Sequence, residues 1–288
     1  MLASLICTTI DGSATIERLL TSLSLQTNDS FEIIIVIQTN RTTPVALPDS
    51  LKLQRCRIIT AQMIGLSAAR NIGLSFASGQ ICVFPDDDCT YPPTYVEDLV
   101  RAFSNSDCDI LIGNFYDPNR SCYSFHPDSL SGPMKHADVS RFVSSICIAS
   151  RTTAAEKIEG FDERLGLGAA TGCFAAEDFE FIHRALAFDL SVELSREFTC
   201  YHSLEPRPFS RALIRRFGAQ GGTDVYLSCR YVGFFSALKV GIRYVVGLLY
   251  GIVRANKHST AVYLARVVGV IRYFPMLLLT KRRGWTRK

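Results

Sequence analysis

The 288-residue sequence predicts an α/β fold: a Rossmann-like, mostly parallel central sheet followed by C-terminal amphipathic helices that associate with a membrane. Three observations support this prediction. The first 90 residues alternate apolar, strand-like runs with helical periodicity, an order typical of a parallel sheet covered by helices. Three acidic residues stand just beyond the last of these runs. Basic and aliphatic residues are concentrated in residues 225–288, which contain no acid.

The elements of the N-terminal part follow from the spacing of the apolar residues. Residues 16–25 have helical periodicity, and Asp11 or Ser13 can cap the start of this helix. Residues 31–37 form a nearly continuous β-branched run, as expected of a strand buried on both faces. The expected order is strand 2–9, helix 16–25, strand 31–37, strand 58–60, helix 67–77 and strand 81–84.

Three consecutive acids, Asp86, Asp87 and Asp88, follow strand 81–84 after a single proline. They therefore stand at the C-terminal end of a strand, which is where open α/β sheets bind their ligands. Asp86 and Asp88 could face one cleft and bind a hard cation through oxygen, and that cation could neutralise a substrate diphosphate. The simpler alternative is a solvated loop with three surface acids.

Four segments resemble, in order, motifs of the family 2 glycosyltransferases, which have the GT-A fold. They are residues 5–11 with the helix running to Gln26 and Thr27, the Gly-to-Ala-Arg-Asn segment 65–73, the Asp-x-Asp strand end 81–89, and residues 160–163 followed by 176–187. The resemblance implies a nucleotide-sugar-binding half at residues 1–100 and an acceptor-binding and catalytic half at 101–205. Residues 206–288 are expected, from their basic and apolar residues, to form a helical tail that associates with a membrane.

The resemblance also implies an activity and a set of site residues. The activity is inverting transfer of a sugar from a nucleoside-diphosphate sugar to a hydroxyl of a glycan or lipid-linked glycan, in cell-surface polysaccharide synthesis. The implied donor-binding residues are Thr8, Thr9, Asp11, Gln38, Arg70, Asn71, Asp86 and Asp87. The implied ligands of Mg²⁺ or Mn²⁺ are Asp88, Asp86 and His202, and the implied catalytic residues are Asp178 and Glu177.

The roles of Glu177, Asp178 and His202 each have a simpler alternative. Glycosyl transfer needs a base that takes the proton of the attacking hydroxyl, and the resemblance gives this role to Asp178, with Glu177 orienting the acceptor or the helix start. Acids in the first turn of a helix otherwise complement its dipole. His202 follows the expected strand 198–201, where a histidine is otherwise a hydrogen-bonded structural residue.

One departure from the family pattern concerns the nucleotide base. Where the family has Asp-Asp-Gly-Ser after its second strand, this chain has Ile37-Gln38-Thr39-Asn40. Gln38 has a donor and an acceptor and can still bond a pyrimidine edge, but it carries no charge. This change leaves open a non-catalytic sugar-nucleotide-binding or assembly subunit. A nucleotidyltransferase is disfavoured, because the chain lacks a glycine-rich, basic N-terminal loop.

The charge of the chain is divided unevenly. Residues 225–288 contain 12 Lys and Arg and no Asp or Glu, whereas residues 1–224 carry a net charge of −8. The apolar runs of the tail are interrupted by arginines before they reach the length of a membrane span. Treated as one helix, the tail has Lys239, Arg243, Arg254 and Lys257 on one side, a pattern typical of a helix in the membrane interface. The alternative is an oligomer interface with basic edges.

The remaining expectations concern partners and location. The aliphatic bulk of the tail argues against a nucleic-acid partner and favours an anionic membrane surface. The ten cysteines form no Cys-x-x-Cys pair, and Cys7, Cys82 and Cys147 lie in apolar runs, so reduced thiols in the cytosol are expected. No secretory signal peptide is expected, because the first apolar run has no charged leader. We therefore expect a peripheral, monotopic enzyme at the cytoplasmic face of the cell membrane.

Overall fold

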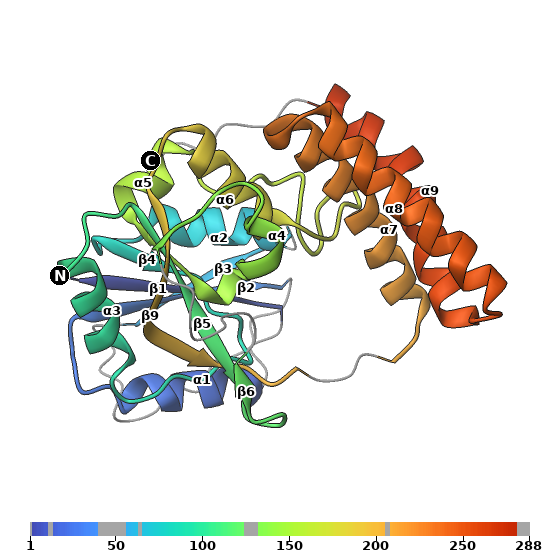
Figure 1. Cartoon of the computed structure of the whole chain (residues 1–288). Helices are drawn as coiled ribbons and strands as arrows, with labels where there is room; N and C mark the ends of the chain where they lie inside the picture. The colour runs from blue at the N-terminus through green and yellow to red at the C-terminus, as the bar shows by residue number, and fades with distance from the viewer. Residues whose placement is uncertain are drawn as a thin grey trace.

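The computed structural model describes residues 2–10, 14–39, 56–62, 65–123, 132–204 and 208–280. An α/β body built on a nine-stranded sheet is followed by a unit of long helices that packs on one end of the body (Figure 1). The sheet order among the described strands is β3-β2-β1-β4-β8-β5-β9-β7, with β6 paired to β5. The predicted α/β class is confirmed.

The N-terminal part of the body, predicted as the donor half, is a parallel sheet with helices on both faces (Figure 1). Strand β1 (Ala3–Thr9) is buried along its whole length between β2 (Phe31–Gln38) and β4 (Ile81–Val83), and β3 (Cys56–Ala61) lies at the edge. Both faces of β1 and β2 are covered, which explains their continuous apolar sequences. The helices α1 (Ala14–Ser24) and α2 (Leu66–Ser75) lie on opposite sides of this sheet.

The part of the body that follows, predicted as the acceptor half, adds antiparallel pairing that the sequence did not reveal. Strand β8 (Ile148–Arg151) lies antiparallel between β4 and β5 (Ile110–Asp117), and β5 pairs in parallel with β9 (Val192–Tyr201). The other elements of this half are α3 (Tyr95–Ser104), β6 (Cys122–Tyr123), β7 (Gly132–Pro133), α4 (Val139–Phe142), the 3₁₀ turn η2 (Ser145–Cys147), α5 (Thr152–Lys157) and α6 (Glu177–Ala187).

An isolated pairing joins the ends of the two halves. Thr90 and Tyr201 exchange both backbone hydrogen bonds, at 2.9 and 2.8 Å. Because Thr90 follows the acidic run after β4 and Tyr201 ends β9, this bridge brings the residues beside them together. Asp88 and His202, 114 positions apart in the chain, therefore come to lie side by side.

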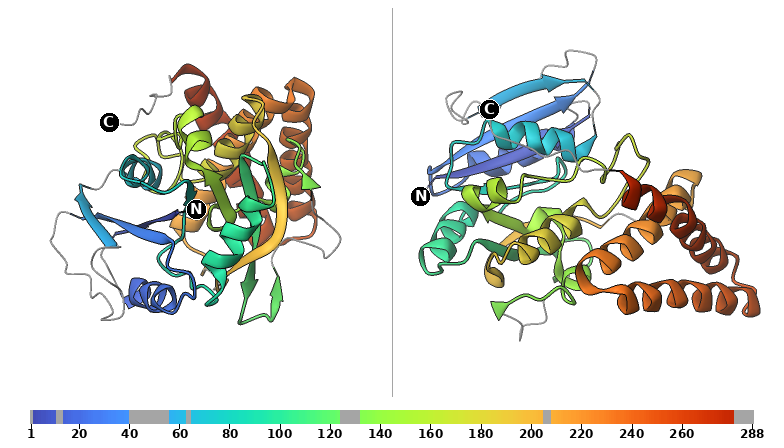
Figure 2. Two further views of the ribbon diagram at one scale, coloured as in Figure 1. Left: turned by 90° about the vertical axis from the view of Figure 1, so that its left-hand side faces the viewer. Right: turned by 90° about the horizontal axis from the view of Figure 1, so that it is seen from above.

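The tail is a set of three helices rather than one. The three are α7 (Arg211–Leu227), α8 (Phe234–Val253) and α9 (Lys257–Leu279), which Figure 2 shows packed together, and the five-residue π-helix η3 (Ser228–Val232) continues α7 toward α8. The prediction of a single basic stripe is wrong. Asn256 caps α9 by accepting a hydrogen bond from the Ser259 amide at 3.0 Å, and Ala255 has a φ of 51°. The chain therefore turns between Arg254 and Lys257.

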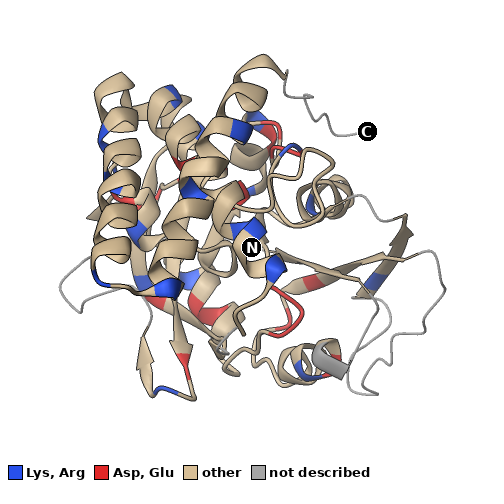
Figure 3. Cartoon of the chain, turned by 90° about the vertical axis from the view of Figure 1, so that its right-hand side faces the viewer, with Lys and Arg blue, Asp and Glu red and all other residues tan. Residues whose placement is uncertain are grey.

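The close approach of α7 to α9 depends on glycine. A Cβ on Gly269 would lie 1.7 Å from the carbonyl oxygen of Gly218, and one on Gly222 would lie 2.6 Å from that of Gly269. Helices approach this closely only where small residues face each other. Both α8 and α9 are long and apolar enough to cross a membrane by length and composition. Figure 3 shows their basic residues distributed along the helical unit.

Candidate active site

Four residues from β1 and the end of β4 meet at one edge of the sheet. Thr8 forms an isolated parallel bridge with Asp86, and the hydroxyl of Thr9 donates to Asp87 Oδ2 at 2.6 Å. The two threonines are buried, whereas the carboxylate of Asp86 is 41% exposed. The structure thus brings together the predicted donor residues of the first strand and of the acidic run.

Arg70 connects this acidic run to the acids of α6. Its guanidinium, only 1% exposed, lies with Nη2 3.0 Å from Asp86 Oδ1 and Nη1 3.4 Å from Glu177 Oε1. It also lies 5.2 Å from the ring centroid of Phe161. A buried guanidinium is stable only beside negative charge, so Arg70 and the two carboxylates stabilise one another. Residues from three distant segments are thereby held at one point.

Asp178 has the electrostatic environment of a general base. It lies in the first turn of α6, accepts a hydrogen bond from the Phe179 amide at 2.9 Å, and is partly buried. Burial, together with the negative charge of Glu177, raises the pKa of Asp178 to about 7. Burial also raises the pKa of Glu177, against the opposing effect of Arg70. A carboxylate with a pKa near 7 can accept a proton at neutral pH.

Asp88 and His202 form a second pair at the open side of the acidic run. His202 Nε2 lies 3.3 Å from Asp88 Oδ1, and the side chain of Asp88 is 46% exposed. Their hydrogen bond lowers the pKa of Asp88 and raises the pKa of His202. Ligand atoms of Asp88, Cys89 and His202 lie within 4.8 Å of one another.

These residues fit a divalent cation in part. The ionised Asp88 and the imidazole of His202 are suitable ligands, and His202 Nδ1 is buried with no hydrogen-bond partner among the described residues. The Cys89 thiol is not suitable for a hard cation, because its hydrogen bond to Cys200 and its burial raise its pKa well above the usual value. Asp86, also predicted as a ligand, lies outside this compact group and is paired with Arg70.

The side chain of Asn71 forms hydrogen bonds within the protein. Its amide donates to the Phe161 carbonyl and to Glu163 Oε1, both at 3.0 Å, and accepts from the Phe161 amide at 2.7 Å. These bonds tie α2 to the loop before α6, a role the sequence did not indicate. The predicted contact between Asn71 and the donor stays a prediction.

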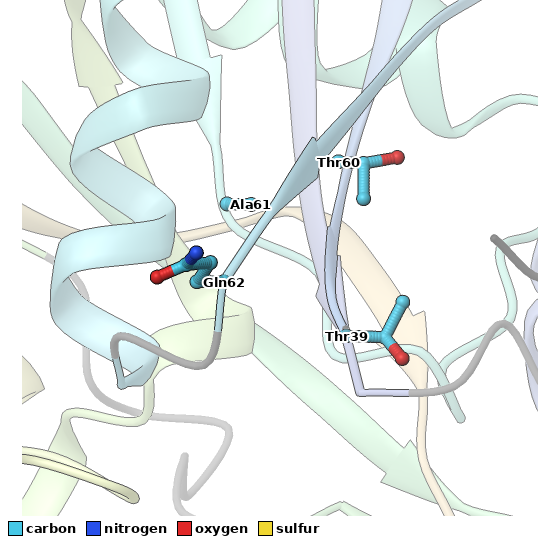
Figure 4. Close-up of a pocket in the computed structure, with 4 residues that line it drawn as sticks. All are labelled: Thr39, Thr60, Ala61 and Gln62. Carbon is cyan, nitrogen blue, oxygen red and sulfur yellow. The ribbon is translucent and has the colours of Figure 1, made fainter. Parts of the chain in front are cut away.

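The predicted base-reading region lies at the ends of β2 and β3. Gln38 is buried there, and a hollow of about 570 Å³ is lined by Thr39, Thr60, Ala61 and Gln62 (Figure 4). Figure 4 shows the side chain of Gln62 directed toward α2. Asp11, also predicted to contact the donor, lies outside the described residues.

Arg164 is a buried side chain that the sequence analysis missed. It forms an ion pair with the fully buried Asp162, with Nη2 2.6 Å from Oδ2, and donates to Tyr226 in α7 and to the Leu277 carbonyl in α9, both at 3.1 Å. Its position directly after the recognised segment 160–163 was the available indication. Asp162 is thus committed to an ion pair inside the protein.

Comparisons with known proteins agree with this site. The family model of glycosyl transferase family 2 matches residues 4–181. Glycosyltransferase GlyA of Streptococcus pneumoniae serotype 4 is 33% identical over 115 residues, which are 38% of this chain and 16% of GlyA. GlyG of the same organism is 29% identical over 104 residues, 35% of each protein. The match therefore spans about a third or less of these relatives.

Solved structures share the fold at low sequence identity. S. aureus TarS 1–349 has a TM-score of 0.57 and 16% identity, over 94% of this chain and 91% of that one. The same protein in complex with UDP-GlcNAc gives 0.56 and 15%, over 94% and 92%. These likenesses support the predicted GT-A fold. Because the family model covers most of the α/β body, including the acidic run after β4 and the acids of α6, the chain belongs to glycosyl transferase family 2.

Proposed function

We propose that this glycosyltransferase transfers a sugar, with inversion, from a nucleoside-diphosphate sugar to a hydroxyl of a glycan or lipid-linked glycan in cell-surface polysaccharide synthesis. The observation that carries the proposal is the pairing of buried Arg70 with both Asp86 and Glu177. This pairing holds the donor-side acids beside the base Asp178. The solved complexes of TarS with UDP and UDP-GlcNAc support a nucleotide-sugar donor for the shared fold.

Asp178 would accept the proton of the acceptor hydroxyl while the hydroxyl oxygen attacks the anomeric carbon. A bond from that oxygen to the anomeric carbon forms as the bond from the carbon to the diphosphate oxygen breaks, and the electron pair leaves with the nucleoside diphosphate. Attack from the side opposite the leaving group inverts the configuration. Asp88 and His202 would hold Mg²⁺ or Mn²⁺, which supplies positive charge for the leaving diphosphate.

Release of nucleoside diphosphate by the purified chain tests this function. Nucleotide sugars are first screened by thermal stabilisation with Mn²⁺ or Mg²⁺, because a bound ligand raises stability by mass action. We expect Asp178→Asn to keep the affinity for the donor and to lower turnover by about 10²-fold or more. Asp189→Asn, at an exposed position just beyond the C-terminal end of α6, is the matched control and should keep full turnover.

Two results would contradict the proposal. Equal turnover in Asp178→Asn and the parent would place the base elsewhere. The chain could also bind donors but release no nucleoside diphosphate with any donor and metal that bind. That result would favour the non-catalytic subunit suggested by Gln38.

We further propose that the chain is peripheral at the cytoplasmic face of the membrane, with α8 as its membrane-facing helix. The outward side of α8 is apolar and covers an arc of about 160° at 100° per residue. Its exposed members are Phe234, Phe235, Leu238, Ile242, Val245, Val246, Leu249, Tyr250, Ile252 and Val253. Lys239 and Arg243 are exposed at one border of this arc. Apolar insertion and attraction to anionic lipid together support stable peripheral binding.

A further inference from the structure

The loop between Asp162 and Glu177 lies between the donor half and the C-terminal helices. On the side of the body, Ser67 donates to the Leu165 carbonyl at 2.6 Å, and the Leu66 amide donates to the Leu167 carbonyl at 2.8 Å. Both donors belong to the first turn of α2, the helix that carries Arg70. This side of the loop is therefore fixed to the donor half.

The other side of the same loop packs against α7 and α9. Leu165 and Ala176 form a buried cluster with Tyr226 of α7 and with Tyr273 and Leu277 of α9. Ala176 has a φ of 67° and stands directly before Glu177 and Asp178. The last residue before the catalytic helix is thus held in the left-handed region by contacts that include the C-terminal helices.

Arg164 connects these contacts through polar bonds. Besides its ion pair with Asp162 and its bond to the Tyr226 hydroxyl, it donates to the carbonyls of Leu277 and Thr280 at the end of α9. The last carbonyls of a helix have no partner within the helix and attract positive charge. If α9 moved relative to the body, the loop would therefore move with it, because the Arg164 guanidinium is bonded both to the end of α9 and to Asp162.

We propose that Arg164 is a positioning residue through which the C-terminal helices hold the catalytic carboxylate Asp178 in place. The proposal rests on the proposed function, in which Asp178 is the base. It assigns the helical unit a second role: besides membrane attachment, α7 and α9 complete the catalytic loop. Turnover should then depend on the Arg164 contacts, whereas donor affinity, which depends on residues of the donor half, should not.

The test compares Arg164→Lys with Arg151→Lys in the full chain. Lysine keeps the positive charge but cannot form the planar set of bonds that arginine forms. Arg151 is the matched control, because it also donates to backbone carbonyls, those of Cys108, Phe103 and Ser106, but it does so at the end of the sheet where β4 begins, away from the acidic run. The measurements are kcat and donor KM for release of nucleoside diphosphate, and the pH dependence of kcat.

We expect Arg164→Lys to lower kcat by about tenfold or more, with donor KM within about twofold, and to shift the pH at which the rate is half-maximal. Arg151→Lys should change kcat and donor KM by no more than about twofold and should leave the pH dependence of kcat unchanged, even if it lowers Tm. Tyr226→Phe, which removes one bond to Arg164, should lower kcat in the same direction but less. If Arg164→Lys does not fold, kcat, donor KM and the pH dependence of Tyr226→Phe are compared with those of Arg151→Lys instead, and that comparison tests the inference.

Equal kcat and equal pH profiles in Arg164→Lys and Arg151→Lys would overturn the inference. So would a defect of Arg164→Lys confined to donor KM. Failure of the proposed function would be a separate result. In that case Asp178→Asn would turn over as fast as the parent, or the parent itself would show no turnover.

Discussion

At the scale of single residues, the site depends on how burial and charge set the state of each carboxylate. Asp178 and Asp88 lie at the same edge of the sheet, yet their pKa values move in opposite directions. Asp178 is desolvated next to Glu177, whereas Asp88 is bonded to His202 and half exposed. Two carboxylates with separated pKa values suit two roles, proton acceptor and cation ligand.

The pH dependence of the reaction should report Asp178. The base must be deprotonated to accept a proton, and its pKa is raised to about 7. We therefore expect kcat to rise with pH and to level off above about pH 7, since most of the carboxyl is ionised there. Initial rates of nucleoside diphosphate release between pH 5 and pH 9 are the measurement. A rate that is constant from pH 5 upward would be inconsistent with this base.

Asp178→Asn should also change stability in a pH-dependent way. A carboxyl whose folded-state pKa is raised destabilises the folded state progressively as pH rises toward that pKa. Replacing it with a neutral amide should raise Tm at pH 8 by roughly 2–4 °C, the shift that about 1 kcal/mol produces in a chain of this size. Near pH 4 the two proteins should unfold alike. Calorimetry at both values of pH checks this, and a lower Tm of the variant at pH 8 would contradict it.

Asp88 and Asp86 should respond differently to substitution. Asp88→Ala removes a proposed cation ligand and should abolish the metal-dependent part of donor binding. Asp86→Ala should weaken donor binding and leave Arg70 with Glu177 as its remaining carboxylate partner, so we also expect a lower Tm for this variant. Thermal shifts with UDP, with and without Mn²⁺, separate the two effects. Unchanged nucleotide affinity in both variants would contradict the prediction that Asp86 and Asp88 line the donor-binding cleft.

At the scale of elements, the sequence predicted the helices and strands whose apolar residues are regularly spaced. The strands of the donor half and the helices α1, α2 and α6 appear within a few residues of their expected bounds. Strand β8 was not predicted, because four residues between short turns have too little sequence to show a period. The break between α8 and α9 was also missed, since neither glycine nor proline marks it and a single Asn256 forms the cap.

Side-chain contacts between distant segments could not be predicted at all. The motif residue Arg70 was identified by resemblance, but nothing in its neighbourhood along the chain shows that it joins Asp86 to Glu177. The pairing of Asp88 with His202 was expected only through a shared metal. Arg164 lay beside a recognised motif, but its partners in α7 and α9 depend on how the tail folds back on the body.

The packing of α7 on α9 gives a prediction at this scale. Gly269→Ala places a methyl group against the Gly218 carbonyl and should destabilise the protein by about 2–3 kcal/mol, because the backbone there cannot yield cheaply. Gly241→Ala in α8 is the control: its Cβ meets nothing within 4 Å, so the substitution should stabilise by about 0.5–1 kcal/mol. Urea unfolding measures both. Equal effects would mean that α7 and α9 do not pack in solution as described.

At the scale of the whole molecule, the tail and the catalytic body form one structure. Tyr273 and Leu277 of α9 pack on the loop that leads to Asp178, so removing α9 would expose part of the core. Surface substitutions on α8 therefore test membrane binding more cleanly than truncation does. They change the outward apolar arc and leave the contacts of α9 with the body intact.

The double variant Val246→Glu with Leu249→Glu should lose binding to anionic vesicles and keep soluble donor hydrolysis. Both side chains are more than half exposed on α8, and buried apolar area dominates interfacial binding. Phe188→Glu, exposed to a similar degree on the α/β body, is the control and should bind vesicles like the parent. High salt should weaken the binding of the parent, because screening removes the electrostatic part.

Other outcomes of the vesicle experiment would point to other topologies. Retention of the parent in the membrane pellet after alkaline carbonate would indicate that α8 and α9 span the bilayer, as their length and composition permit. Dimers that form in detergent-free buffer and dissociate in the double variant would instead identify α8 as an oligomer interface.

The antiparallel strand β8 determines when a growing chain can join the two parts of its sheet, because β8 lies between β4 and β5. Val83 of β4 pairs with Ala149, and Arg70 meets Glu177 only after a further stretch of synthesis. A chain stopped before Ala149 would leave one edge of β4 open, and a chain stopped before Glu177 would carry the buried Arg70 guanidinium without that carboxylate beside it. Contacts this distant in sequence slow folding, and synthesis runs from the N-terminus. The nascent chain should therefore assemble the proposed active site late, after Glu177 and Asp178 have been made.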